Sequence, residues 1–218
     1  MSVPSTLLVP LVAGLGALAG AGLTIVSAHL AAGQGLVARA PHWERIATPL
    51  LSALFLASLA WRLGTGWSLV SRSLWALILI QIVVFDLRHG LILDRVLLPA
   101  GLLAALLSWL TPGLSWRESL LTGALTGLAF LAVARAGQAL FKAEALGLGD
   151  VKLSAFMGLC LGFPGVVWAV IAGVLAGGVA AAVLLVTGLA GRHDHFAYGP
   201  FLAGGSLLAL FLLPPGRT

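Results

Sequence analysis

Residues 147–178 read GLGDVKLSAFMGLCLGFPGVVWAVIAGVLAGG, a stretch with one acid and one base among residues that are otherwise almost all apolar or small. Long blocks of Leu, Ala, Val and Gly without strand-like alternation favour helices over a barrel in a lipid environment. Charged residues make up 9% of the whole chain and hydrophobic residues 60%, against about 25% and 45–50% in soluble domains. The sequence therefore predicts an all-α, polytopic integral membrane protein.

Hydrophobic segments along the chain predict about eight transmembrane helices. They cover approximately residues 7–29, 48–61, 69–85, 91–110, 120–134, 153–162, 165–189 and 200–213. Several are shorter than the roughly 20 residues that a straight span needs, so tilted or broken helices are expected. The sequence Phe163-Pro164-Gly165 fits either a tight turn between two helices or a kink within one long helix.

The basic residues predict the orientation of these helices. The chain carries a net charge of +5, but its twelve Lys and Arg are scattered singly and form no stripe for a nucleic acid. If Phe163-Pro164-Gly165 is a turn and the N-terminus lies outside, the positive-inside rule is satisfied two to one. The cytoplasmic loops then hold Arg39, Arg45, Arg88, Arg95, Arg135, Lys142, Lys152 and Arg192.

Two aspartates stand out because only seven acidic residues occur in the chain. Asp86 ends the apolar stretch 74–85, and Asp150 follows Gly147 and Gly149. An ionised Asp in a bilayer costs several kcal/mol, so such residues usually face a cavity or a partner and carry function. If the two segments pack side by side, both carboxyl groups converge at the cytoplasmic boundary.

Two carboxyl groups about 3 Å apart titrate as a pair that shares one proton. The ionised member takes a proton from water while the neutral member polarises a peptide carbonyl, which is the chemistry of an aspartic protease. Glycines before Asp150 would allow unusual backbone angles and close approach of a substrate strand. The pair therefore suggests proteolysis without a covalent intermediate.

Structural explanations of the same residues remain open at this stage. Asp86 can form an ion pair with Arg88 at a helix end, and Asp150 can cap a helix that begins near Lys152. Asp94 raises a Mg²⁺ alternative, although such enzymes would be expected to show more closely spaced acids and clustered arginines. A proton-coupled transporter is a further alternative, although no duplicated half is visible.

Other polar or small residues have simpler interpretations. His193, Asp194 and His195 could hold a metal ion, but a solvated polar turn is the favoured interpretation. The single cysteine, Cys160, lies in an apolar stretch, excludes an internal disulfide and is expected to be a small packing residue. Small-residue seams for close helix packing are predicted at Gly14, Gly16, Gly20 and Gly22, and at Gly173, Gly177 and Gly178.

Three blocks of sequence resemble the type IV prepilin peptidases, aspartic endopeptidases of the GxGD class. They are residues 86–94, reading DLRHGLILD; residues 147–153, reading GLGDVKL; and residues 197–205, reading AYGPFLAGG. The resemblance implies that Asp86 and Asp150 are the catalytic acids. It implies substrate-binding or supporting roles for Gly147, Gly149, Lys152, Asp94, Gly199 and Pro200. One departure is Leu93, where the family usually has proline.

The likeness divides the chain into an N-terminal transmembrane region, residues 1–68, and a peptidase membrane domain, residues 69–218. Bifunctional family members carry a zinc-binding loop with two Cys pairs and methylate the new N-terminus with S-adenosylmethionine. Residues 31–47 occupy that place and contain no cysteine, so a zinc knuckle is excluded and methyl transfer is left open.

The resemblance also implies a substrate and a location. It implies cleavage of a short basic leader from prepilins or pseudopilins at the cytoplasmic face of the bacterial inner membrane. No metal or other cofactor is expected for proteolysis, and no nucleic acid partner is expected. A catalytically impaired relative that binds pilins is the closest alternative.

Overall fold

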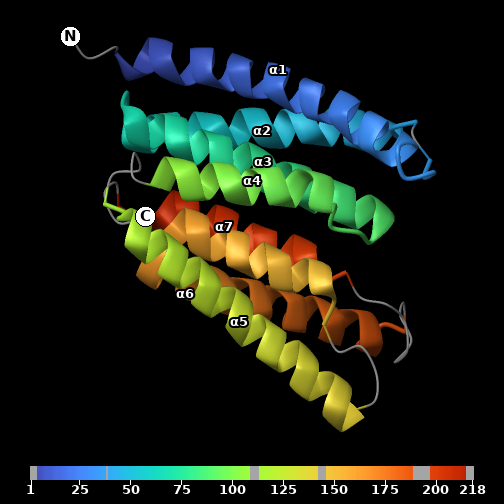
Figure 1. The fold of residues 1–218 in the computed structure, drawn as a ribbon. Coiled ribbons are helices and arrows are strands. Elements are labelled where there is room, and N and C mark those ends of the chain that lie inside the picture. The colour runs from blue at the N-terminus through green and yellow to red at the C-terminus, as the bar shows by residue number, and fades with distance from the viewer. Residues whose placement is uncertain (1–3, 38, 109–112, 142–145, 189–196, 215–218) are drawn as a thin grey trace. The chain divides into compact units, whose positions relative to one another are not determined.

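The computed structural model describes residues 4–37, 39–108, 113–141, 146–188 and 197–214. Within these ranges the chain is all-α, as predicted, and forms seven helices (Figure 1). They are α1 (Ser5–Ala32), α2 (His42–Leu63), α3 (Trp67–His89), α4 (Asp94–Leu107), α5 (Trp116–Phe141), α6 (Leu148–Val186) and α7 (Gly199–Leu212).

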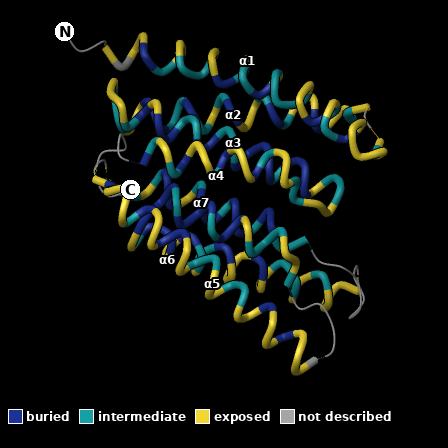
Figure 2. The backbone as a smooth tube through the Cα atoms, in the orientation of Figure 1, coloured by how far each residue is buried: buried dark blue, intermediate teal, exposed yellow. Residues whose placement is uncertain are grey.

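The helices have the length and composition of a multi-pass membrane protein. Among the described residues, α1, α2, α3, α5 and α6 are long and apolar enough to cross a membrane. Exposed residues recur along α1, α2, α4 and α5 in Figure 2, and many of them are large and apolar. Lipid provides a favourable environment for such surfaces, whereas large apolar patches are rare on soluble monomers. The predicted class is therefore confirmed. About eight transmembrane helices were expected, and the described residues form seven helices, of which α6 is broken into two parts.

The chain folds into two compact units, Met1–His89 and Gly90–Thr218. Unit 1 contains α1, α2 and α3, and unit 2 contains α4 to α7. The motif-based division between residues 68 and 69 groups α3 with the helices that follow it, and that division remains a prediction.

In unit 1, two of the four predicted seam glycines bring α1 and α2 together. A Cβ atom on Gly16 would lie 2.8 Å from the carbonyl oxygen of Ser52, and one on Gly20 would lie 2.6 Å from the Cα of Pro49. Gly14 and Gly22 have nothing within 4 Å of a Cβ position. Small residues thus permit backbone contact, which replaces the hydrophobic driving force that lipid removes.

In unit 2, glycines again join neighbouring helices. A Cβ atom on Gly158 of α6 would lie 2.7 Å from the Cα of Gly123 on α5. The hydroxyl of Ser119 adds a hydrogen bond of 2.7 Å to the carbonyl oxygen of Leu159. Further along α6, toward its C-terminal end, a Cβ atom on Gly173 would lie 2.8 Å from the carbonyl oxygen of Phe201 on α7.

The chain reverses direction within α6. Gly162 has φ 60 and ψ −172, and Phe163 has φ −94 and ψ 138, so the helical path is broken there. The part before Gly162 packs on α5 and the part after it packs on α7. Figure 1 shows these two halves doubling back alongside each other. Of the two interpretations of Phe163-Pro164-Gly165, the structure favours the turn, because Gly162 can adopt the left-handed φ that a side chain disfavours.

Candidate active site

The acid of the second motif lies in the first turn of α6. Gly147 is the N-cap residue, and its carbonyl oxygen accepts hydrogen bonds from the backbone N–H groups of Asp150 (3.1 Å) and Val151 (3.4 Å). The helix therefore begins before Asp150, and the interpretation of Asp150 as the cap of a helix starting near Lys152 is wrong. A carboxylate in the first turn is favoured by the helix dipole.

The two glycines of this motif act differently from what the sequence suggested. Gly147 has φ −69 and ψ 148, an extended conformation that any residue can adopt, so the expected unusual angles are not found there. Gly149 permits a close approach, because a Cβ atom on it would lie 3.1 Å from the Cβ of Ile92, which is tighter than an ordinary contact. Its missing side chain makes room for the segment that precedes α4.

The last residue of the first motif is bound to the second motif. Lys152 Nζ lies 2.7 Å from both carboxylate oxygens of Asp94, the first residue of α4. Among the described residues, no group of three or more His, Cys, Asp and Glu side chains lies together. His193, Asp194 and His195 lie outside the described residues.

Asp86, the other motif acid, belongs to unit 1 and is buried within α3, one turn before the helix ends at His89. The helix stops there because Gly90 has φ 61, the left-handed conformation that commonly terminates helices. Leu93, the departure from the family pattern, has φ −80 and ψ 123 and is the N-cap residue of α4.

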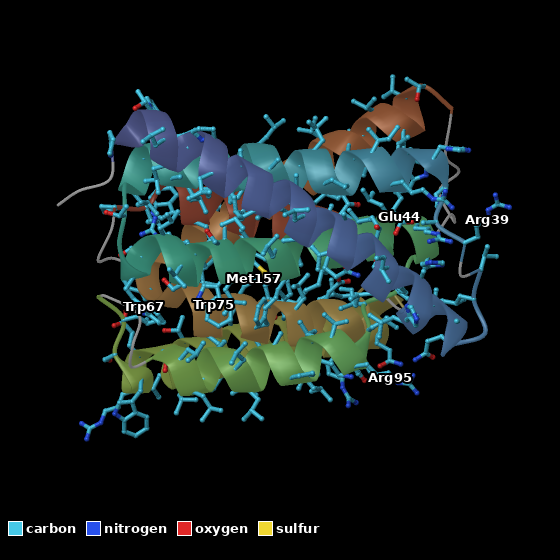
Figure 3. All side chains as sticks on the ribbon, turned by 90° about the horizontal axis from the view of Figure 1, so that it is seen from above. Arg39, Glu44, Trp67, Trp75, Arg95 and Met157 are labelled. Carbon is cyan, nitrogen blue, oxygen red and sulfur yellow. The ribbon has the colours of Figure 1, made fainter. Side chains whose placement is uncertain are left out.

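Arg88, two residues after Asp86, ties three parts of unit 1 together. Its Nη1 lies 2.8 Å from Oε2 of Glu44 in the first turn of α2. Its Nη2 donates hydrogen bonds to the carbonyl oxygens of Val37 and Arg39 in the loop between α1 and α2. Figure 3 shows Arg39 and Glu44 near one end of unit 1, with Trp67 at the opposite end. The salt bridge of Arg88 is thus made with Glu44.

The third motif lies beside the second. Gly199 and Pro200 are buried at the start of α7. The ring of Tyr198, just before them, packs on α6, where a Cβ atom on Gly177 would lie 2.7 Å from Cε2. Burial raises the pKa of Tyr198, and the negative charge of Asp150 raises it further. The phenol is therefore close enough to Asp150 to sense its charge.

Several residues of this region were not among the candidates taken from the sequence. They are Glu44, Ile92, Gly177 as a neighbour of the site, and Tyr198. Tyr198 carried a usable signal, because it is the only tyrosine of the chain and adjoins the Gly199-Pro200 pair. Ile92 carried none, since an apolar residue among many gives no hint of its contact.

Unit 2 therefore brings together the tail of the first motif, the second motif and the start of the third. These helices define a polytopic membrane protein in which the first and second motifs meet where α4 and α6 begin. The sequence profile of the Type IV leader peptidase family matches residues 73–182, which include Asp86, Asp94 and Asp150. The chain belongs to this family.

Curated relatives match about three quarters of the chain. A prepilin leader peptidase/N-methyltransferase of Bacillus subtilis is 31% identical over 163 residues, which cover 75% of this chain and 64% of the relative. Proteins of the same name from Xanthomonas campestris and Aeromonas hydrophila are 27% and 28% identical. Each match covers 74% of this chain and 56% of the relative. The chain thus spans less than two thirds of these relatives. No solved structure matches it significantly.

Proposed function

We propose that this protein is an aspartic endopeptidase that removes the leader peptide from type IV prepilins or pseudopilins. The observation that carries the proposal is the joining of two family motifs in unit 2. Lys152 bonds both oxygens of Asp94, and Gly149 packs against Ile92. The segment that follows Asp86 is thereby held beside the helix start that bears Asp150.

In the proposed mechanism Asp86 and Asp150 share one proton. The ionised carboxylate takes a proton from water, and the neutral one polarises the scissile carbonyl by donating a hydrogen bond. Attack of the water gives a tetrahedral diol, and a carboxylic acid then returns a proton to the leaving amine. Asp86 stands six residues before Ile92 in the sequence.

The proposal includes an arrangement in the bacterial inner membrane. The two halves of α6 would count as separate spans, giving eight, and an external N-terminus would put both acids on the cytoplasmic side, as the basic residues favour. The membrane potential and anionic lipids would hold a basic leader there, while the adjoining apolar pilin helix would lie in the bilayer. No metal or cofactor is proposed for cleavage, and chelators are expected to leave it unchanged.

The test is leader removal from a type IV prepilin by the full chain in membranes. We expect the parent to cleave and Asp86→Asn and Asp150→Asn, which keep the side-chain size, to lose detectable cleavage. Glu118→Gln is the matched control, because this acid lies near Gly162, at the end of the first half of α6 remote from Asp150. Mass spectrometry of the processed pilin would report the cut position and any N-methylation together.

Two outcomes would overturn separate parts of the proposal. A parent that binds the pilin without removing its leader would make the protein an impaired relative. Cleavage that persists in both aspartate variants would refute the shared-proton mechanism. The same mechanism requires one neutral and one charged acid, so the rate should depend on pH as a bell whose two pKa values belong to the pair.

A further inference from the structure

The start of α6 presents two of its motif residues to the start of α4. Gly149 and Lys152 are three residues apart, so they lie on the same face of the helix. Gly149 packs on Ile92 and Lys152 bonds Asp94. Because each helical residue turns by about 100°, Asp150 projects from a different face than Lys152.

The facing segment has a matching geometry. Leu93 is extended, with φ −80 and ψ 123, and alternate residues of an extended segment point to the same side. Ile92 and Asp94, on either side of Leu93, therefore both reach α6. The three-residue spacing of Gly149 and Lys152 on the helix thus matches the two-residue spacing of Ile92 and Asp94 on the extended segment. Both contacts can therefore form together.

The ion pair between Lys152 and Asp94 is exposed to solvent, so it can align two segments without adding much to folding stability. The side chains of Lys152 and Asp94 are 42% and 53% exposed, and exposed ion pairs contribute little to folding stability. Each Lys152 to Asp94 distance is nevertheless 2.7 Å, and both carboxylate oxygens are engaged. A pair that is well formed but weakly stabilising is suited to fixing the register of two segments.

We propose that Lys152 and Asp94 form a clasp that aligns the segment following Asp86 with the helix start bearing Asp150. Lys152 is then a positioning residue and does not bind the substrate. This inference rests on the proposed endopeptidase function. The clasp predicts that the two charges can be exchanged between positions 94 and 152, provided that one position stays positive and the other negative.

The test is a charge reversal in the full chain, with leader cleavage measured as kcat and KM. Lys152→Asp and Asp94→Lys should each lower kcat about tenfold or more, as coupling between contacting residues allows, with little change in KM or in the melting temperature. The double variant with both substitutions should recover most of the lost kcat and the parent's pH profile.

Three results would count against the clasp. A double variant as slow as the slower single variant would overturn it, and so would single variants whose KM rises while kcat stays unchanged, since that indicates substrate binding. Single variants that retain the parent's kcat would also overturn it. A parent without any cleavage would instead refute the proposed function, and the clasp with it.

The contact itself can be tested without activity. In a Cys160→Ala background, Ile92→Cys and Gly149→Cys should form a disulfide under mild oxidation. Their Cβ positions lie 3.1 Å apart, so a widening of about 0.4 Å brings them into the range of about 3.5–4.5 Å that a disulfide needs. Leu91→Cys with Gly149→Cys is the control, because Leu91 precedes Ile92 and is exposed. Equal bonding in both pairs, or none in the first, would contradict the contact that the clasp requires.

Discussion

The two motif aspartates have parallel sequence settings and contrasting surroundings. Each is followed two residues later by a cation that forms an ion pair with another acid. The Arg88 and Glu44 side chains are 10% and 1% exposed, and their closest atoms lie 2.8 Å apart. The Lys152 and Asp94 side chains are 42% and 53% exposed at 2.7 Å. The two ion-pair distances are nearly equal, so the pairs differ in how far their side chains are exposed to solvent.

That difference assigns the two pairs different tasks. Burying two charges is costly unless hydrogen bonds satisfy their remaining groups, and Arg88 gains such bonds from the carbonyl oxygens of Val37 and Arg39. The pair in unit 1 therefore fixes a loop, and the loss of either member would leave a charge that is largely shielded from water. The pair in unit 2 remains near water, where it can align two segments at little cost or gain in stability.

The largest expected effect is on the stability of unit 1. Glu44→Ala leaves the Arg88 side chain, which is only 10% exposed, without its carboxylate. This change should lower the free energy of unfolding by up to about 3–5 kcal/mol. Asp94→Ala, the matched change in the exposed pair, should cost less than about 1 kcal/mol. Denaturant unfolding of both variants in lipid-detergent micelles measures the two values. Equal losses would remove the contrast between the pairs.

A second effect concerns the packing beside Asp150. Gly177→Ala would place a Cβ atom 2.7 Å from the ring of Tyr198, and such overpacking should cost about 1–3 kcal/mol. Gly178→Ala is the control, because nothing lies within 4 Å of its Cβ position and alanine favours the helix by up to about 1 kcal/mol. Thermal melting of the two variants compares them. A destabilised Gly178→Ala variant with an unaffected Gly177→Ala variant would contradict this packing.

The smallest effect is a change in one pKa. Tyr198 is the only tyrosine, so phenolate absorbance on raising the pH titrates it alone. Its pKa is raised by burial and by Asp150, so Asp150→Asn should lower the titration midpoint, whereas Asp94→Asn should leave it in place. An unchanged midpoint in Asp150→Asn would place Tyr198 away from that charge.

The same shift fixes the direction of a stability change with pH. Because the folded state holds the phenolic proton more tightly than the unfolded state, its contribution is complete below the unfolded pKa of about 10. The contribution is lost as the pH rises through the higher folded pKa. Tyr198→Phe should lack this loss of stability at alkaline pH.

Much of the fold could be predicted because it depends on local composition. Apolar blocks predicted the helices, and the burial of Cys160 followed from its apolar surroundings. The number of helices was less accessible, since Phe163-Pro164-Gly165 fits both a turn and a kink, and the break depends on the backbone angles of Gly162 and Phe163. Half of the first glycine seam was also mispredicted, because Gly14 and Gly22 face no neighbour.

The candidate site was predicted in its residues more than in their roles. The motif containing Asp150 does start a helix, but Gly149 makes room for Ile92, and Gly147 has an ordinary backbone conformation. The assignment of Asp86 and Asp150 as catalytic acids remains a prediction. Tyr198 was overlooked because its nearness to Asp150 depends on the reversal of α6, which no local pattern specifies.

By itself, the sequence determined the lipid environment, the helical class and the family motifs, since each depends on residues close together along the chain. Only the tertiary structure decided which partner each charge found. Lys152 meets Asp94 across 58 residues and Arg88 meets Glu44 across 44. Such pairings depend on how helices pack, and the packing depends on which glycines allow two backbones to touch.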